Sequence, residues 1–327
     1  MEAKISLEMT GGKNIPTIGL GTWQVTEEAE LEKALNAALE AGYRHIDTAF
    51  AYSNEAIIGR VLNQWLSSGK VKREELFITT KLPISGVHED RVEMFMKKSL
   101  ENLKLDYVDL YLIHFPIGTN YVEGYVWPPP DQMKLEPSNH VEIWKKMEQQ
   151  VDAGRARAIG LSNFNQKQIE KVIKSSTIKP ACLQIELHVL LQQQELVRFC
   201  QQNGIVVVAF SPLGSPGYNK FLKSTGKGEK ELPNLLQNPL VKKIAGKHGK
   251  SSGQVLLRFL VQQDIVAIPK SVNSSRIKEN IDIYDFNLDS EDMKGLYDLD
   301  IGERILDLKS MPIFHDHPEW PWKVLLN

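Results

Sequence analysis

Residues 205–211 read IVVVAFS, a short run in which only the last residue is polar. Runs of this kind suit strands that are buried on both faces, as in a parallel sheet. Longer stretches with helical periodicity separate them. In residues 27–42, Leu31, Leu35 and Leu39 fall on one apolar stripe, and Gly42 follows as a C-cap. The other seven runs are IGLGT (18–22), RHIDTA (44–49), LFITTK (76–81), VDLYLIH (108–114), ARAIGLSN (156–163), CLQIELH (182–188) and IVAIPKS (265–271).

Eight strands that alternate with helices predict an α/β fold of the (β/α)8 TIM-barrel type. Because no linker rich in Pro, Gly and Ser interrupts the pattern, we expect a single domain over residues 1–327. A doubly wound open sheet is the alternative fold.

Four segments lie outside the regular alternation. Residues 4–20, KISLEMTGGKNIPTIGL, predict an N-terminal β-hairpin that turns at Gly11-Gly12 and is placed to plug the barrel floor. Residues 118–140 and the segment after Phe210 are too long for ordinary connections, so we expect long loops on the C-terminal face. We also expect extra helices besides those of the alternating units. The tail from residue 302 to 327 has an irregular pattern with several prolines.

Composition excludes several classes of protein. The chain has 327 residues, and its formal charge of −2 gives no basic excess for nucleic acid. Its two cysteines, Cys182 and Cys200, do not make a disulfide framework and fit a reducing compartment. No apolar window approaches the roughly 18 residues of a membrane span, and the N-terminus is not a signal peptide. We therefore expect a cytoplasmic monomer with no membrane or nucleic-acid partner.

Polar residues end three neighbouring runs. Asp47, Lys81 and His114 stand at the ends of the second, third and fourth predicted strands, and Tyr52 follows in the loop after Asp47. The carboxyl ends of barrel strands share one face, and that face carries the active site in this fold class. The four side chains are therefore expected to converge. The alternative is that each is an ordinary solvated strand end.

Together these four groups suit the protonation of an oxygen. A phenol has a pKa of about 10, and a neighbouring ammonium is expected to lower that pKa while the carboxylate keeps the lysine charged. Tyr52 would then donate a proton to an oxygen that gains negative charge, and a neutral His114 would polarise the same oxygen. A carbonyl that accepts a hydride needs this arrangement. Because no side chain supplies a hydride, a nicotinamide cofactor is required.

Several motifs in order resemble the aldo-keto reductase superfamily. They are HIDTAFAYSNEAIIG (45–59), TTKLP, DLYLIHFP, AIGLSNFN, LQIELH, FSPLGS and IPKSV. The similarity runs from GLGTW to RIKENIDIYDFNL (276–288). It implies a (β/α)8 barrel in which Asp47, Tyr52, Lys81 and His114 are the catalytic tetrad.

The resemblance also implies the cofactor. No G-x-G-x-x-G is present, because Gln24 stands where the third glycine belongs. In the family, the segment that matches residues 268–280 binds an adenosine 2′-phosphate, which implies NADPH. A capped helix with a solvated basic face is the alternative, and Ser271 or Asn273 suits the N-cap in either case. Phe210 replaces the usual tyrosine but keeps a π-face for stacking. The implied cofactor-binding residues are Thr22, Trp23, Asp47, Ser162, Asn163, Gln184, Phe210, Ser211, Leu213, Ser215, Lys270, Ser271, Asn273, Arg276, Glu279 and Asn280.

The expected substrate is a hydrophobic carbonyl compound. Pro83 and Phe115 stand where tryptophans are common in aldose-type members, which implies a roomier and less polar pocket. The chain resembles insect-type members that reduce hydrophobic aldehydes or steroid-like ketones. His315 and His317 form H-x-H without a third ligand nearby, so no metal is expected. Expected substrate-binding residues are Trp23, Tyr52, His114, Phe115 and Trp127, and further candidates for the pocket lining are Met311, Phe314, Trp320 and Trp322.

The sequence thus predicts an NADPH-dependent oxidoreductase that reduces aldehydes and ketones to alcohols. His114, where double-bond reductases of the family carry glutamate, favours carbonyl over alkene reduction. One alternative is a binding or structural protein built on the same barrel. Another is a barrel isomerase or aldolase that uses Lys81 as a Schiff-base amine.

Overall fold

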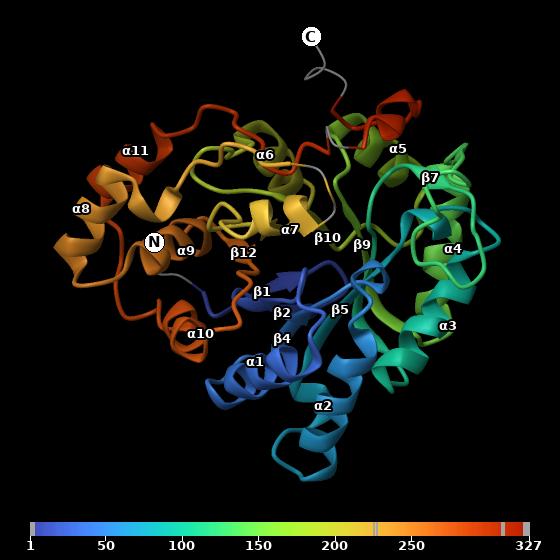
Figure 1. Ribbon diagram of the computed structural model, residues 1–327, viewed down its shortest axis with the longest axis horizontal. Helices are drawn as coiled ribbons and strands as arrows, with labels where there is room; N and C mark the ends of the chain where they lie inside the picture. The colour runs from blue at the N-terminus through green and yellow to red at the C-terminus, as the bar shows by residue number, and fades with distance from the viewer. Residues whose placement is uncertain (1–3, 225, 227, 309–310, 323–327) are drawn as a thin grey trace.

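Eight parallel strands form one sheet in the computed structural model, which describes residues 4–224, 226, 228–308 and 311–322. Each strand is hydrogen-bonded to the next in the order β3-β4-β5-β6-β9-β10-β11-β12. Figure 1 shows the sheet at the centre of the molecule. The strands are β3 (Gly19–Gly21), β4 (His45–Asp47), β5 (Phe77–Leu82), β6 (Val108–Ile113), β9 (Ala156–Ser162), β10 (Cys182–Glu186), β11 (Val206–Phe210) and β12 (Ile265–Ala267).

The first and last strands of this sheet meet and close the barrel. Parallel bridges join Ile18 to Ala267 and Gly21 to Lys270, and the Gly21 amide donates to the Pro269 carbonyl at 3.1 Å. A Cβ at Gly21 would lie 2.7 Å from the Ile268 carbonyl oxygen, so only glycine lets the two strands approach. The predicted barrel is therefore confirmed, and the alternative of a doubly wound open sheet is wrong.

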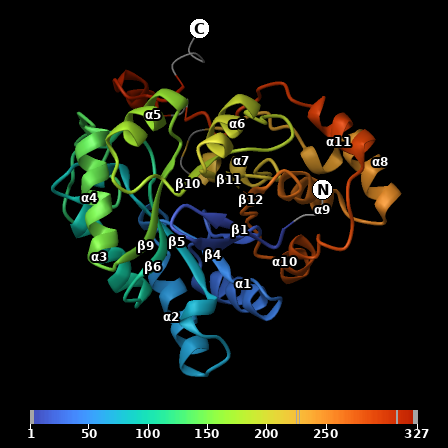
Figure 2. The ribbon, with the colours of Figure 1, turned by 180° about the vertical axis from the view of Figure 1, so that it is seen from behind.

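Helices surround the sheet, as Figures 1 and 2 show. Their stripes of buried residues face the strands; in α1 these include Leu31, Leu35 and Leu39, as the periodicity predicted. Helices α7, α8 and α11 are additional to the alternating units, which confirms the expectation of extra helices. The helices are α1 (Glu28–Glu40), α2 (Glu55–Ser67), α3 (Val92–Leu103), α4 (His140–Asp152), α5 (Gln166–Ser175), α6 (Gln194–Gln202), α7 (Tyr218–Ser224), α8 (Pro239–His248), α9 (Ser252–Val261), α10 (Ser274–Ile281) and α11 (Ser290–Tyr297). Short 3-10 helices are η1 (Phe50–Tyr52), η2 (Arg73–Glu75), η3 (Ile84–Gly86), η4 (Leu235–Gln237) and η5 (Pro312–Asp316).

The predicted N-terminal hairpin is present and covers one end of the barrel. Strands β1 (Ser6–Met9) and β2 (Lys13–Pro16) pair antiparallel and turn at Gly11 and Gly12, both with positive φ. Their buried side chains pack against residues near the beginnings of the barrel strands. This apolar cluster includes Leu7, Met9, Ile15, Phe77, Leu110, Ala158, Val206 and Val266.

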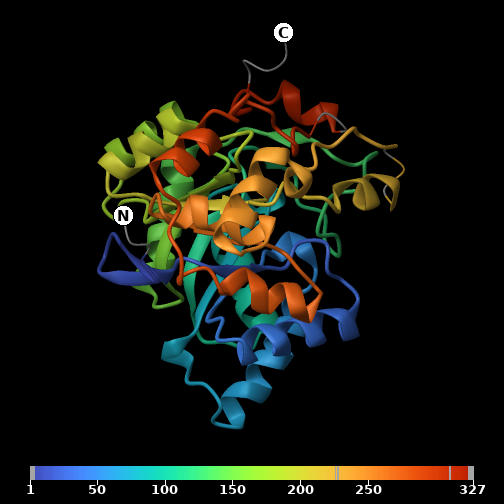
Figure 3. The ribbon, with the colours of Figure 1, turned by 90° about the vertical axis from the view of Figure 1, so that its left-hand side faces the viewer.

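The long segments lie at the other end of the strands. Residues 118–140 contain the short antiparallel pair β7 (Gly118–Thr119) and β8 (Leu135–Glu136). The segment after β11 contains α7 and η4, and the described part of the tail contains η5. Figure 3 shows the red tail and the yellow-orange segment around α7 on the same side of the molecule. The single-domain prediction includes residues 1–3, 225, 227, 309–310 and 323–327, and the tail prediction includes the last two of these ranges; all of them lie outside the described residues.

No helix in the described part of the chain is both long enough and apolar enough to cross a bilayer.

Candidate active site

The four predicted residues meet at the carboxyl ends of three adjacent strands. Asp47 ends β4, Lys81 is the penultimate residue of β5, and His114 directly follows β6. Tyr52 ends η1, the turn that follows β4. The local signal for Asp47, Lys81 and His114 is a polar residue at or next to the end of a buried strand. The structure brings these three residues and Tyr52 together, as the sequence predicted.

Lys81 is the centre of the group. Its side chain has 0 % exposure, and its ammonium lies 2.6 Å from Asp47 Oδ1, 2.8 Å from the Thr48 carbonyl and 3.4 Å from the Tyr52 hydroxyl. A buried charge is tolerated only when it is paired and its hydrogen-bonding capacity is used, and these three acceptors match the three protons of the ammonium. An amine held in this way is not available to form a Schiff base, so the geometry argues against the aldolase alternative.

Two residues expected at the cofactor hold Asp47 in this structure. Gln184 on β10 donates its amide to Asp47 Oδ2 at 2.8 Å, and the Thr22 hydroxyl donates to the Asp47 carbonyl at 2.9 Å. Each carboxylate oxygen therefore has a donor. Asn54, which the sequence analysis did not single out, joins the same corner by donating to the Thr22 carbonyl at 2.9 Å.

His114 is half-buried beside the phenol. Its ring meets the Tyr52 ring edge-on, with centroids 5.6 Å apart and an interplanar angle of 75°. The Asn163 amide donates to the His114 carbonyl at 2.9 Å, from a left-handed backbone conformation at the end of β9. Burial, and next the charge of Lys81, hold the pKa of His114 well below its usual 6.5. The imidazole is therefore neutral near pH 7, the state expected of a hydrogen-bond donor to a carbonyl oxygen.

The expected effect on the phenol is corrected by the structure. Burial, and next the negative charge of Asp47, raise the pKa of Tyr52 well above 10. The desolvation of a phenolate and the direct repulsion from Asp47 both oppose the effect that was expected of the neighbouring ammonium. Burial also lowers the pKa of Lys81, while Asp47 opposes that shift. Tyr52 is consequently a protonated phenol at neutral pH, which is the form that can give up a proton.

The candidate nicotinamide and pyrophosphate contacts lie at the ends of β9 and β11 and, for Gln184, within β10. Ser162 ends β9 and is buried, and Phe210 ends β11 and is half-buried. Ser211 and Ser215 both have positive φ, and their hydroxyl groups are 2.6 Å apart. Leu213 between them packs against the main core. These residues border the same end of the barrel as Lys81.

The start of α10 has the character of an anion site. The Asn273 side chain accepts from the Arg276 amide at 3.0 Å and is the N-cap, and the Ser271 hydroxyl accepts from the Asn273 amide at 3.2 Å. Lys270 and Arg276 are exposed. Backbone amides at a helix start together with two cations fit a phosphate group. Of the two residues expected at the adenine, Glu279 accepts from the Ser251 hydroxyl and Asn280 is buried.

Aromatic residues from the tail pack beside the tetrad. Phe115 is buried and contacts Trp320 and Trp322, with ring centroids 5.6 and 5.3 Å apart. Trp23 is half-buried, 6.3 Å from the Tyr218 ring. Trp127 is 39 % exposed and lies 6.4 Å from Phe314. Met311 and Phe314 belong to the same apolar cluster as Phe115.

His317 serves a purpose that the sequence argument missed. It is buried, its Nε2 donates to the Glu136 carbonyl at 2.7 Å, and its Nδ1 accepts from the Glu319 amide at 3.0 Å. It thus holds η5 against β8. The H-x-H motif drew attention to this residue, but only the fold supplies its partners. No group of three potential metal ligands occurs among the described residues.

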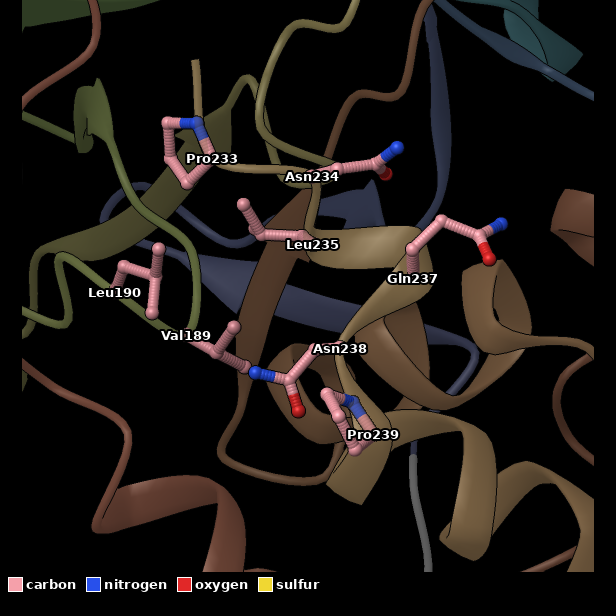
Figure 4. A pocket seen from close by; sticks show the side chains of 8 residues that line it. All are labelled: Val189, Leu190, Pro233, Asn234, Leu235, Gln237, Asn238 and Pro239. Carbon is pink, nitrogen blue, oxygen red and sulfur yellow. The ribbon is translucent and has the colours of Figure 1, made fainter. Parts of the chain in front are cut away.

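Pockets away from the tetrad are a separate feature. One of about 260 Å³, drawn in Figure 4, lies between Val189-Leu190 and the segment Pro233–Pro239. A larger open groove of about 1050 Å³ lies beside the hairpin and is lined by residues such as Leu7, Gln201 and Tyr297. Neither is lined by a residue of the tetrad.

Comparison with known proteins places these features in context. The model of the Aldo/keto reductase family matches residues 17–301. The chain is 43 % identical to Aldo-keto reductase family 1 member A1 of Gallus gallus over 95 % of each chain. It is 39 % identical to NAD(P)H-dependent D-xylose reductase I,II of Candida tropicalis, over 94 % of this chain and 97 % of the relative. The structure of the aldose reductase from Schistosoma japonicum superposes with a TM-score of 0.87, at 40 % identity and 99 % coverage of both chains.

Proposed function

Because this chain belongs to the aldo/keto reductase family, we propose that it reduces aldehydes and ketones to alcohols with NADPH. The observation that carries the proposal is the buried Lys81–Asp47 pair, whose ammonium lies 3.4 Å from the Tyr52 hydroxyl, with the neutral His114 ring beside it. This arrangement offers a proton donor and a hydrogen-bond donor to one carbonyl oxygen.

The side chains of the tetrad have separate tasks in this proposal. Tyr52 holds the proton that goes to the substrate oxygen, and Lys81 stabilises the phenolate that remains. Asp47 keeps Lys81 charged and in place, and Gln184 and Thr22 keep Asp47 in place. His114 donates to the same substrate oxygen from the other side. When bound, NADPH supplies the hydride.

The cofactor residues are proposed on two grounds. The cations Lys270 and Arg276 at the capped start of α10 suit the 2′-phosphate that distinguishes NADPH from NADH. Ser162 ends β9, Asn163 follows it, and Gln184 lies in the neighbouring strand β10; these three residues suit the carboxamide of the nicotinamide. Phe210 at the end of β11 suits stacking on its ring. The segment Ser211–Ser215 is proposed to cover the pyrophosphate.

The substrate is proposed to be a hydrophobic or steroid-like carbonyl compound. Phe115, which follows His114, packs with the aromatic residues of the tail, and Trp127 lies beside Phe314 of that tail. With Trp23, these residues are proposed to offer the apolar surface that such a substrate needs. We further propose that the protein acts as a single-domain monomer in the cytoplasm.

Replacement of Tyr52 by phenylalanine tests this function. Tyr52→Phe removes the proton donor, so we expect kcat for an aldehyde to fall by about 100-fold or more, since general acid catalysis contributes at least that much. NADPH affinity, followed by fluorescence titration, should change less than about twofold, because the hydroxyl is not among the proposed cofactor contacts.

Tyr125→Phe, at an exposed tyrosine in the segment 118–140, is the matched control and should keep the activity of the natural protein. Turnover by Tyr52→Phe at the rate of this control would disprove the proposed role.

A further inference from the structure

Lys230 joins the segment after β11 to the C-terminal tail. Its ammonium donates to the carbonyls of Arg304 at 3.0 Å and Ile305 at 3.2 Å, and it lies 3.2 Å from Asp307 Oδ2. The lysine side chain is 28 % exposed and the aspartate side chain 15 %, so the contact is partly shielded from water. The backbone of Lys230 is in turn paired with the Asn219 side chain of α7, at 2.7 and 2.9 Å. The lysine is therefore anchored on α7 while its amine reaches the tail.

The same stretch of tail is held from the barrel side. The carboxylate of Glu186, fully buried at the end of β10, accepts from the Ile305 amide at 2.7 Å and from the Leu306 amide at 3.0 Å. Ile305 thus has its N–H bound to a strand of the barrel and its C=O bound to the segment after β11. Its side chain has no exposure and packs with Tyr218 and Leu222 of α7.

This stretch lies next to the proposed substrate site. On one side, Trp23 packs against the cluster that contains Ile305. On the other, the guanidinium of Arg304 lies 4.2 Å from the centre of the Trp322 ring, and Trp322 meets Phe115 edge-on. Since Phe115 follows His114 directly, residues 304–307 stand between two aromatic residues proposed to contact substrate.

We propose that Lys230 is a positioning residue that holds residues 304–307 as one wall of the substrate site. This inference rests on the proposed function. It adds that the substrate side and the cofactor side of the site are coupled. Through Lys230, the wall beside the substrate is tied to α7. The first amide of α7, that of Tyr218, donates at 2.9 Å to the Ser215 carbonyl in the segment proposed to cover the pyrophosphate. Methionine at position 230 would keep the length of the side chain but remove all three donors. The tail would then keep its hydrogen bonds to Glu186 but lose those to the Lys230 ammonium.

The experiment combines hydrogen exchange with kinetics for Lys230→Met. In the protein without cofactor, the amides of residues 303–308 should exchange about tenfold faster in the variant, as expected for the loss of hydrogen bonds worth about 1.4 kcal/mol. KM for an apolar aldehyde should rise by about five- to tenfold, with kcat and the Kd of NADPH within about threefold of the natural protein. Lys230→Arg keeps a cationic donor and should recover most of both effects.

The matched control is Lys223→Met. Lys223 lies on α7 itself, and its exposed ammonium pairs with Glu229. Exchange in the tail and KM should therefore stay as in the natural protein. Asp307→Asn keeps both carbonyl acceptors of the Lys230 ammonium, so it should speed amide exchange in the tail by a smaller factor. This variant replaces Lys230→Met if Lys230→Met fails to fold.

Two failures are distinguishable. Unchanged tail exchange and unchanged KM in Lys230→Met, with the natural protein active, would overturn the role of Lys230 alone. If the natural protein neither binds NADPH nor reduces carbonyl compounds, the proposed function fails. The exchange comparison without cofactor would still decide whether Lys230 positions the tail.

Discussion

Lys81 illustrates at the level of one residue how the site is built. Burying an ammonium and a carboxylate costs several kcal/mol per ion before their attraction is counted, so a buried pair is weak evidence of a contribution to stability. Here Asp47, the Thr48 carbonyl and Gln184 satisfy the two charges. The pair is better explained by what it does to Tyr52, whose hydroxyl is the third acceptor of the ammonium.

His45 makes the stability of the protein depend on pH. The imidazole is buried between Pro16 and Thr79, and burial, the largest cause, lowers its pKa from 6.5 to about 4. The folded state therefore binds fewer protons than the unfolded state between these values, so stability falls as the pH drops below 6.5. From pH 7.5 to pH 5 this group alone should cost about 2 kcal/mol of the free energy of unfolding. Urea denaturation of the natural protein and of His45→Gln at both pH values measures this.

In His45→Gln the free energy of unfolding should fall by about 2 kcal/mol less between pH 7.5 and pH 5 than in the natural protein, because glutamine does not titrate. An equal loss in both proteins would assign the pH dependence to other groups.

At the level of the strand, register explains why residues far apart in sequence share one site. Asp47 on β4 pairs with Thr79 on β5, and Lys81 lies two residues further along β5. Lys81 in turn pairs with Leu112 on β6, and His114 lies two residues further. A step of two residues keeps a side chain on the same face of a sheet. Each strand end thus presents its polar residue to the barrel interior, staggered by the shear of the barrel.

The start of α10 is the element proposed to select the cofactor. Arg276→Met should lower the preference for NADPH over NADH by about tenfold or more, because a charge-assisted hydrogen bond is worth about 1.5–3 kcal/mol. The affinity for NADH should stay almost unchanged, since NADH has no 2′-phosphate. Fluorescence titrations with both cofactors measure the ratio.

Lys278→Met on the same helix is the control, because Lys278 is equally exposed but lies in the last turn of α10. An unchanged ratio of the NADPH and NADH affinities in Arg276→Met, or an equal change of that ratio in Lys278→Met, would contradict this assignment.

In the molecule as a whole, the hairpin residues that stabilise the fold and the residues proposed to catalyse the reaction lie at opposite ends of the barrel. The hairpin closes the end where the strands begin, and the tetrad lies where they finish. Ile15→Ala, at a hairpin residue with no exposure, should lower the free energy of unfolding by about 3 kcal/mol through the cavity it leaves. At 25 °C its kcat and KM should stay within about twofold of the natural protein, because the cavity lies at the far end. Urea denaturation and steady-state kinetics test both statements.

Ile5→Ala changes the same residue type just before β1, where Ile5 is 71 % exposed, and should cost little stability. Equal losses in the two variants, or a large fall in kcat for Ile15→Ala, would contradict this division.

Much of the fold and part of the site could be predicted because their signals are local. Apolar runs, glycines in the hairpin turn and polar strand ends each occupy a few consecutive residues. The contributions of Glu186, His317 and Lys230 could not be predicted in this way, because their partners lie far along the chain, such as Ile305 for Glu186 and Glu136 for His317. The predicted direction of the pKa shift of Tyr52 was wrong for a related reason, since desolvation depends on everything packed around the phenol.

The sequence by itself determined the barrel, the hairpin and the order in which polar residues meet at the strand ends, because periodicity and strand termination are set by neighbouring residues. Only the tertiary structure decided the direction in which the pKa of the phenol shifts, the donors that hold Asp47 and the path of the tail beside Phe115. These depend on burial and on contacts across the molecule, and both exist only after the chain has folded.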